Sequence, residues 1–568
     1  MHSQPRVLQA SLTAATALLS VVWAASGLAD PAGTVLPSIS SRTDRFALTR
    51  PADVPSDEEL EAAGARIGEV RVEIHNIFET SVPEENTALF RLGNRLHIET
   101  RDSTVRSQLL FQPGEPYAGR LLDESERILR RTRYLYDAQI VPSAWHDGLV
   151  DILVVTRDVW TLNPGFAFSR SGGENEGGIE IEELNLLGFG SQLEFAVRSD
   201  IDRDSTSLLF RDSQLFDTWW SGMLSLADNS DGETRLLALD HPFYSLDTRY
   251  AGGVFAKTDD RVDSLYDLGE VVDEFETRQD TSTVYVGYSQ GLRSGWTTRW
   301  TTGFTYDRNL FGPAPDSTLS DFVPPDRTLA YPWVGYEIVE DDFETARNRD
   351  QIERTEDVAL GWRARAQLGW ASEAWGADRD AVVFSAIVSK GFEPTDRRRL
   401  LFSAGLDGRL EDGGAVDTVL GASARFYLRQ STNRLFFAAL ETEVGSNLDP
   451  DHQILLGGDN GLRGYPLRYQ GGQGRWLATV EQRYFSNWYP FRLFHVGGAI
   501  FADAGETWGA NPRGTPSQGV LKDVGFGLRL GNARSGLGNV LHIDLAFPLD
   551  GDASIDGVQL LVETKASF

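Results

Sequence analysis

From residue 162 to the end of the chain, apolar and polar side chains alternate in short runs separated by turn-rich or acidic loops. A period of two is typical of strands with one apolar and one polar face. The last run shows the alternation most clearly, because its apolar face contains Val558, Leu560, Val562 and Phe568. We therefore predict that this whole region consists of strands.

A soluble β-sandwich and a membrane β-barrel both fit such alternation. No segment after the N-terminus reaches the ~18 consecutive apolar residues of a membrane-spanning helix. Without such helices, a chain can satisfy its backbone in lipid only as a closed barrel. Charged side chains on the polar faces suit a wet lumen, and aromatic pairs gather near strand ends, where membrane interfaces lie. These pairs are Trp219-Trp220, Phe243-Tyr244 and Trp488-Tyr489.

These features favour the all-β class, with a transmembrane antiparallel β-barrel over residues 162–568. A scan of the sequence gives about twenty candidate strands of spanning length, some of which we assign to loop hairpins. If the two ends of the barrel region lie on the same side of the membrane, the number of strands must be even.

The N-terminus predicts export. Residues 1–29 combine Arg6, an apolar stretch and a small-residue Gly-Leu-Ala end, the pattern of a secretory signal peptide. Residues 30–65 are rich in Pro, Ser, Asp and Ala and are interpreted as a linker. The chain has no cysteine, so it uses no disulfide and no thiolate metal site. Its net charge of −30 argues against nucleic acid as a partner.

Residues 67–158 have a different pattern from the barrel region. "IGEVRVEIHNIF" alternates as a half-buried strand, and "DSTVRSQLLFQPGEPY" predicts a short helix that ends at Pro113-Gly114. "LLDESERILRR" predicts a second helix, and "DAQIV" and "LVDILVVTRDVW" predict two further strands. The order is β-α-α-β-β, a small α+β domain whose second strand could form a sheet edge.

Several motifs of the chain resemble those of one superfamily. They are "GEPY", "LLDESERILRRTRYLYDA" and "VDILVVTRD" in the α+β domain, and "NLLGFG", "LRGY", "VEQRYF" and "FADAG" in the barrel region. The chain resembles the outer-membrane protein assembly factors and two-partner-secretion transporters of the bacterial surface antigen family. The resemblance implies one polypeptide-transport-associated (POTRA) domain over residues 67–158, where many members have several. It also implies a barrel of sixteen strands, fewer than the scan finds.

The glycine-rich stretch "LLGGDNGLRGYPLRYQGGQG" contains the motif Leu462, Arg463, Gly464 and Tyr465. The resemblance implies that this loop folds back into the lumen, where Arg463 is held by acidic residues of the wall. Glu481 and Asp503 both face inward on the alternation and are the predicted partners. Asp503 belongs to a strand motif with Phe501 and Gly505. The alternative is an ordinary exposed loop arginine.

Signals for chemistry are weak. "GYSQG" around Ser289 matches the nucleophile elbow of lipases, but that motif needs a helix after the turn, and another strand follows here. "DGDASID" lacks the closing Glu of a calcium loop, and His542 is interpreted as a polar wall residue. We expect no catalytic residue, no metal and no cofactor, and the protein is not predicted to be an enzyme.

The favoured function, which the resemblance implies, is an outer-membrane assembly factor or transporter that inserts or translocates polypeptides by strand addition. Incoming chains would pair with the POTRA edge, formed by Ala138, Gln139, Ile140 and Val141, and with the seam between the first and last barrel strands. The expected partners are outer-membrane lipid and lipopolysaccharide, unfolded client polypeptides, and a periplasmic or lipoprotein partner on the POTRA domain.

The expected location is the outer membrane of a Gram-negative bacterium, with the POTRA domain in the periplasm. The alternative functions are a passive pore or structural barrel, and a secreted enzyme that rests on Ser289 alone. The identity of the clients is not encoded in these patterns.

Overall fold

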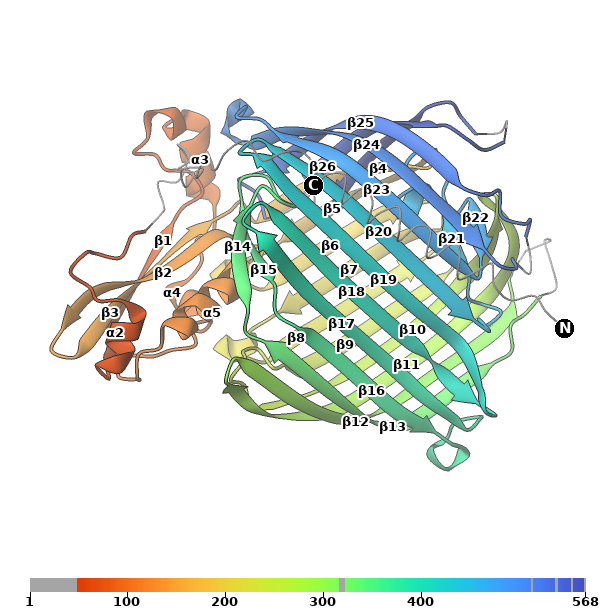
Figure 1. The fold of residues 1–568 in the computed structure, drawn as a ribbon, viewed down its shortest axis with the longest axis horizontal. Coiled ribbons are helices and arrows are strands. Elements are labelled where there is room, and N and C mark those ends of the chain that lie inside the picture. The colour runs from red at the N-terminus through yellow and green to blue at the C-terminus, as the bar shows by residue number, and fades with distance from the viewer. Residues whose placement is uncertain (1–47, 316–321, 512–513, 537–539, 553–554, 566–568) are drawn as a thin grey trace.

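The computed structural model describes residues 48–568, apart from 316–321, 512–513, 537–539, 553–554 and 566–568. The predicted signal peptide, the first part of the predicted linker and Phe568 lie outside the described residues. The described chain forms a small α+β domain beside a large barrel (Figure 1).

Within the described residues, twenty strands close the barrel, each antiparallel to its neighbours. The first ten in chain order are β4 (Leu162–Ser171), β5 (Glu174–Glu183), β6 (Gln192–Ser199), β7 (Asp204–Asp212), β8 (Ser221–Asn229), β9 (Gly232–His241), β10 (Tyr250–Asp267), β11 (Glu270–Arg293), β12 (Trp296–Pro313) and β13 (Arg327–Glu340). The others are β16 (Arg363–Ala371), β17 (Ala381–Thr395), β18 (Arg398–Glu411), β19 (Gly414–Ser431), β20 (Arg434–Ser446), β23 (Gly474–Phe485), β24 (Phe494–Trp508), β25 (Leu521–Asn532), β26 (Val540–Pro548) and β27 (Gln559–Lys565).

The expectation of sixteen strands is wrong. The barrel has twenty, an even number, with five of them, β23 to β27, after the "LRGY" motif. Barrel diameter grows with the number of strands, and every additional hairpin repeats the same alternation. A motif in the loop between β20 and β23 therefore sets the order of the strands that follow it but does not limit the number that precede it.

Side chains alternate between lipid-type and lumen-type environments. On β5, Ile179 and Ile181 are exposed on the outer wall, whereas Glu182 is buried on the inner wall. Similar outward apolar residues lie on many other strands, among them Phe195, Val284, Leu368, Ile500 and Phe526. No helix in the described part of the chain is both long and apolar enough to span a bilayer.

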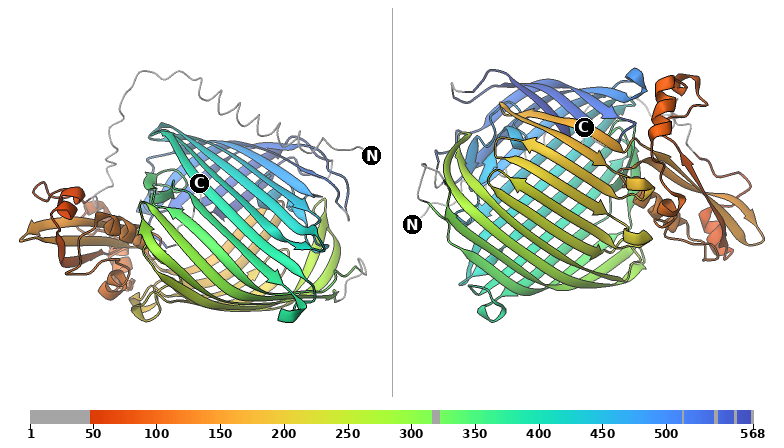
Figure 2. Two further views of the ribbon diagram at one scale, coloured as in Figure 1. Left: turned by 60° about the horizontal axis from the view of Figure 1, so that its bottom comes forward. Right: turned by 180° about the vertical axis from the view of Figure 1, so that it is seen from behind.

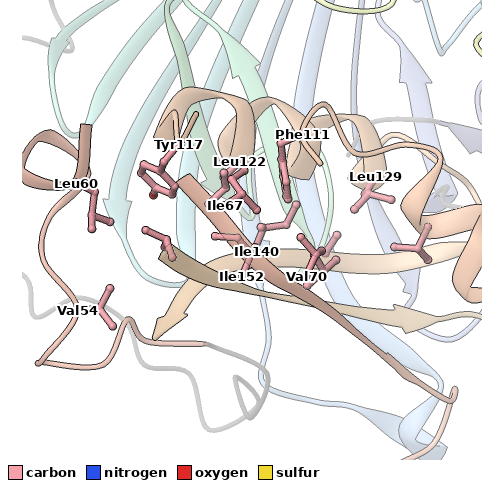
Figure 3. Packing of buried hydrophobic residues seen from close by; sticks show 14 of the residues in the cluster. Val54, Leu60, Ile67, Val70, Phe111, Tyr117, Leu122, Leu129, Ile140 and Ile152 are labelled. Carbon is pink, nitrogen blue, oxygen red and sulfur yellow. The ribbon is translucent and has the colours of Figure 1, made fainter. Parts of the chain in front are cut away.

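The α+β domain contains β1 (Arg66–His75), α3 (Ala88–Leu96), α4 (Asp102–Arg106), α5 (Gly119–Arg130), β2 (Leu135–His146) and β3 (Leu149–Asp158). The sheet order is β1-β3-β2, with β1 parallel and β2 antiparallel to β3. Leu122 and Leu129 of α5 pack on Ile67, Ile140 and Ile152 of the sheet (Figure 3).

Two helices depart from the predicted organisation. The helix α2 (Asp57–Ala62) lies within the predicted linker and begins at a capping box formed by Ser56 and Glu59. Val54 and Leu60 are buried in the core of the domain, so the folded domain begins before Ile67 (Figure 3). The second is α3, which makes the order β-α-α-α-β-β instead of β-α-α-β-β.

The barrel has two unlike ends. We call the end at which β4 begins the domain-side mouth, because it faces the α+β domain, and the opposite end the far mouth (Figure 2). At the domain-side mouth, β13 and β16 are linked by a hairpin of β14 (Phe343–Arg347) and β15 (Thr355–Ala359). At the far mouth, β20 and β23 are linked by a loop that contains β21 (Ile454–Leu456) and β22 (Gln470–Gly472).

Candidate functional site: the lumen loop, the barrel seam and the domain junction

The loop between β21 and β22, residues 457–469, folds back into the barrel; we call it the lumen loop. Its apolar side chains Leu462, Tyr465 and Tyr469 are buried with Leu477 and Leu521 of the barrel wall. Its backbone turns sharply at Gly461, where φ is 116°, a region that favours glycine. Arg463 lies between these buried side chains and is itself buried.

Arg463 is surrounded by carboxylates. Its Nε and Nη2 donate to the two oxygens of Asp503 at 2.7 and 2.9 Å, and its Nη1 donates to Glu481 at 2.8 Å. Asp544 lies 3.6 Å from Nη1, and the guanidinium sits 3.4 Å from the centroid of the Phe501 ring. The structure thus brings together both predicted partners and the aromatic residue of the "FADAG" motif.

The charges around Arg463 form a network along the inner wall. Glu481 also accepts a hydrogen bond from Arg483 Nε at 2.8 Å, and Asp544 is held by Arg529. All of these side chains are nearly inaccessible to solvent. Buried charges persist in a protein when each is paired and hydrogen-bonded, so removing one of them is costly.

Gly464 lets the loop approach the wall closely. Its N–H donates to Asp523 at 3.0 Å, and a Cβ at this position would lie 2.7 Å from the Cβ of Asp523. The hydroxyl of the next residue, Tyr465, donates to the carbonyl oxygens of Lys522 and Asp550 at 2.8 and 3.1 Å. Position 464 therefore requires glycine for steric reasons. Tyr465 fills the space beside it.

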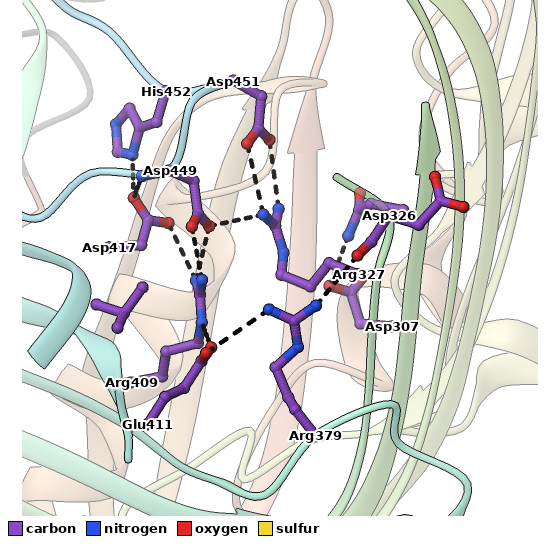
Figure 4. A network of polar contacts seen from close by, with 12 residues as sticks. Asp307, Asp326, Arg327, Arg379, Arg409, Glu411, Asp417, Asp449, Asp451 and His452 are labelled. Carbon is purple, nitrogen blue, oxygen red and sulfur yellow. Dashed lines mark hydrogen bonds and ion pairs between the residues drawn. The ribbon is translucent and has the colours of Figure 1, made fainter. Parts of the chain in front are cut away.

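A second ion-pair network holds the base of the lumen loop at the far mouth (Figure 4). Arg409 of β18 donates to both oxygens of Asp449, at 2.7 and 2.6 Å, and Arg327 of β13 donates to the same carboxylate at 2.6 Å. His452 contacts Asp417 of β19 at 2.7 Å. The chain that leads from β20 into the lumen loop is thus fixed to three strands of the wall.

The seam between the first and last strands is much weaker than the other junctions. Among the described residues, β27 pairs with β4 through Val562 and Arg170 alone, whereas β4 pairs with β5 along its whole length. A cavity of about 1270 Å³ borders the seam, lined in part by Phe168, Glu180 and Lys565. Much of the backbone of both seam strands thus lies without a strand partner on this side.

The lumen loop contacts both sides of the seam at the far mouth. Ser171, the last residue of β4, donates through its hydroxyl to the carbonyl of Gly458 at 3.0 Å. On the other side, Tyr465 and Tyr469 donate to Asp550 and Asp552 in the loop that leads into β27. The loop therefore ties together two segments that the weak strand pairing leaves apart.

The predicted client edge lies on β2, an outer strand of the domain's sheet. The N–H of Ile140 donates to Glu126 at 2.5 Å, and the carbonyl of Ala138 accepts from Arg130 at 3.2 Å. Both side chains come from α5. Gln139 accepts from the N–H of Leu48 at 2.6 Å. Side chains of α5 thus cap this edge, and it is not open. Sequence alternation could not indicate these contacts.

The β14–β15 hairpin joins the domain to the lumen. On the domain side, Asp357 accepts two hydrogen bonds from Arg130, at 2.9 and 2.6 Å, and Thr355 donates to Asp137 at 3.0 Å. On the lumen side, Arg483 donates to Asp350 near the hairpin tip at 3.3 Å. Because Arg483 also pairs with Glu481, contacts run without a break from α5 to Arg463.

The remaining predicted signals fall in two strands of the barrel wall and in one loop. Ser289 is buried in β11, which passes through a tight turn into β12, so no helix follows it. His542 is buried on the lumen side of β26, and the described residues of "DGDASID" lie in the loop between β26 and β27. In the described residues, no group of three or more His, Cys, Asp or Glu side chains is arranged to hold a metal.

Several wall residues of the site were not predicted, among them Arg483, Asp523 and Asp544 near Arg463. Alternation places each of them on the inner face of its strand, so the sequence predicts that their side chains point into the lumen. Their pairing depends on which strands are neighbours and in which register, and the sequence does not specify either.

A closed barrel with an apolar outer belt and a charged, plugged lumen defines the class of this protein: an outer-membrane-type β-barrel. No family model matches the sequence, and no curated protein matches it. Solved structures that match the chain include the following three. BamA from Haemophilus ducreyi lacking POTRA domains 1–3 has 14% identity and a TM-score of 0.37, covering 88% of this chain and 85% of the other.

CdiB from Acinetobacter baumannii has 11% identity and a TM-score of 0.42, with 88% of this chain and 73% of the other covered. The FrpB iron transporter from Neisseria meningitidis has 7% identity and a TM-score of 0.38, with 89% and 94% covered. All three TM-scores are below 0.5.

Proposed function

We propose that this protein is an outer-membrane assembly factor or transporter that inserts or translocates polypeptides at the seam between β4 and β27. The observation that carries the proposal is the single described register pair, Val562 with Arg170, in a barrel whose other strands pair extensively. Unpaired strand edges add further strands through backbone hydrogen bonds. Such pairing tolerates many sequences, as a factor with varied clients requires.

The lumen loop is the element that holds the seam together in this proposal. It is bonded to Ser171 on one side and to the loop at Asp550 on the other, and Arg463 fixes it to the wall. Release of the loop would leave the two seam strands joined only by their short pairing. The α+β domain, interpreted as a periplasmic POTRA domain, would deliver the client, and its contact with the hairpin would transmit its position to the lumen.

A disulfide across the seam tests the proposal. The chain has no cysteine, so R170C/V562C introduces one defined pair at directly opposed positions. The matched control is I179C/V197C, opposed positions on β5 and β6, which pair extensively. In the cells, the variant replaces the unaltered form of this protein. The levels of the other outer-membrane and secreted proteins are then measured with the disulfide oxidised and reduced.

Oxidation of the seam pair is expected to lower a set of these proteins, and reduction is expected to restore them, with no change in the control. Unchanged levels with a fully formed seam disulfide would disprove the proposal. The alternative of a passive pore makes a different prediction. A pore would still conduct ions after deletion of residues 67–158, whereas an assembly factor or transporter would lose its clients.

A further inference from the structure

The helix α3, "ALFRLGNRL", has one face fixed against the domain and one face free. Phe90 is buried and stacks on Phe78 with ring centroids 4.2 Å apart. The side chain of Asn94, one turn further, donates to the carbonyl of Phe78 at 2.7 Å and accepts from its N–H at 3.0 Å. These contacts fix the rotation of the helix about its axis.

The opposite face of α3 is apolar and exposed. Leu89, Leu92 and Leu96 follow a three- and four-residue spacing, so they line one side of the helix. Their side chains are 69%, 50% and 63% exposed. Large apolar side chains that gather on one face mark an interaction surface, whereas scattered ones need no explanation. We call these three residues the leucine face.

Contacts place α3 beside the rim of the barrel. Arg534, in the turn after β25, donates to the carbonyl of Ile77 at 2.6 Å and pairs with Glu85. Leu493, between β23 and β24, packs with Phe78 and Phe90. Figures 1 and 2 show α3 at the edge of the domain-side mouth, next to this part of the wall.

The neighbouring turn of the barrel presents apolar side chains at the same rim. In the turn between β23 and β24, Trp488 is 65% and Phe491 is 81% exposed. Phe491 has a φ of 55°, a strained backbone conformation for a bulky residue. Phe216, in another turn at this mouth, combines a φ of 57° with an exposure of 94%. Exposed apolar residues at the end of a membrane barrel are typical of the lipid–water interface.

The charge of α3 indicates which surface it contacts. The helix carries Arg91 and Arg95 and no acidic residue, in a chain whose net charge is −30. Both arginines are exposed and lie on the side of the helix next to the leucine face. A short helix with an apolar face flanked by arginines is typical of segments that lie in the headgroup region of a membrane.

We propose that the leucine face of α3 binds the lipid surface at the domain-side mouth. Leu89, Leu92 and Leu96 would enter the boundary between headgroups and acyl chains, and Arg91 and Arg95 would contact lipid phosphates. The barrel turn that carries Phe491 lies beside the buried face of α3, through the packing of Leu493. The proposal rests on the barrel lying in a membrane and not on polypeptide transport, and it gives the domain a fixed height and rotation relative to the bilayer.

Spin-label accessibility on the full chain tests this contact. Because the chain has no cysteine, L89C, L92C and L96C each place one nitroxide on the leucine face, and R91C places one on the polar side of the same helix. Each labelled protein is studied in nanodiscs of phosphatidylcholine with and without phosphatidylglycerol. Collisions with oxygen report lipid, and collisions with a water-soluble nickel chelate report solvent.

At positions 89, 92 and 96, oxygen accessibility is expected to exceed nickel accessibility, and the ratio is expected to invert at position 91. Phosphatidylglycerol should strengthen the difference. A water-like ratio at all four positions would overturn the proposal. Low accessibility to both reagents on the leucine face would also overturn it, because a protein partner or second copy would then cover the face. The seam disulfide does not touch α3, so a failure here leaves the proposed function unaffected.

Discussion

Arg130 of α5 and Asp357 of β15 lie 227 residues apart and are joined by two parallel hydrogen bonds, at 2.9 and 2.6 Å. Neither side chain is more than slightly exposed. The same guanidinium bonds to Glu126 and to the carbonyl of Ala138. The Arg130 side chain therefore contacts the hairpin and also caps the edge of the domain's sheet.

Asp357→Ala is expected to undock the domain from the hairpin. It leaves Arg130 partly buried with one fewer carboxylate, a change that costs roughly 3 kcal/mol or more. Amide hydrogen exchange in the hairpin should accelerate by about 100-fold if opening is local. Asp396→Ala, an exposed carboxylate in another turn at the same mouth, is the control and should have no effect. Equal protection in both variants would contradict the coupling.

Glu126→Ala should uncap the predicted client edge. The N–H of Ile140 loses its acceptor, and exchange of this amide is expected to rise about 10-fold, the equivalent of one hydrogen bond. Exchange of the Val154 amide, in the central strand β3, should stay constant because its ladder is intact. Glu58→Ala, at an exposed position on α2, is the matched control. If exchange at Ile140 does not change, α5 does not cap the edge.

The pairing of Arg463 could be predicted because two independent signals agreed. Alternation placed Glu481 and Asp503 on the inner face, and the "LRGY" motif placed the arginine opposite them. The barrel itself could be predicted because its strands are long and strongly periodic. The three strands of the domain's sheet were predictable from one alternating segment and two short apolar segments.

Other features depend on contacts that alternation does not encode. Residues 341–362 are rich in charges and resemble a polar loop, and the hairpin becomes ordered through partners more than 200 residues away, such as Arg130. The helix α3 contains Gly93, which lowers helix propensity, although the cap at Thr87 was a usable signal. The resemblance implied too few strands because the motif at Arg463 does not constrain the front of the barrel, whereas the scan of the sequence gave about twenty candidates.

Arg463→Ala should release the lumen loop without unfolding the barrel. Asp503 would lose both of its hydrogen bonds to the guanidinium, and burial of its unpaired charge costs roughly 3–5 kcal/mol. The strand ladders remain, so the protein should still migrate as a folded barrel on unheated gels, while proteases gain access to residues 457–469. Arg463→Lys is expected to lie in between, because an ammonium cannot reproduce the two-pronged contact. A loop that stays protected in Arg463→Ala would show that the apolar cluster alone holds it.

Gly464→Ala should displace the loop by steric pressure alone. The added methyl would meet Asp523 at 2.7 Å and the backbone nitrogen of Pro548 at 3.1 Å. Gly557→Ala is the control, since a Cβ there would meet nothing within 4 Å. The loop in Gly464→Ala is expected to be cleaved faster than in the control, with the charge network chemically intact. Equal cleavage rates would mean that the wall yields at Asp523.

The base of the lumen loop should loosen as pH rises. The hydrogen bond between His452 and Asp417 raises the pKa of the imidazole above its usual value, against the opposing effect of burial, and the nearby Glu443 and Asp451 act in the same direction. A raised pKa in the folded state means that the folded form binds the proton more tightly than the unfolded form. The stabilisation is therefore complete below about pH 6.5, the ordinary value for histidine, and is lost as pH rises through the higher pKa of the folded state.

Exchange protection factors of residues 447–456 are expected to fall between pH 6 and pH 9, more steeply at low salt because the pair is partly exposed. In His452→Gln the profile should be flat, and a profile of equal slope in this variant would assign the titration to another group.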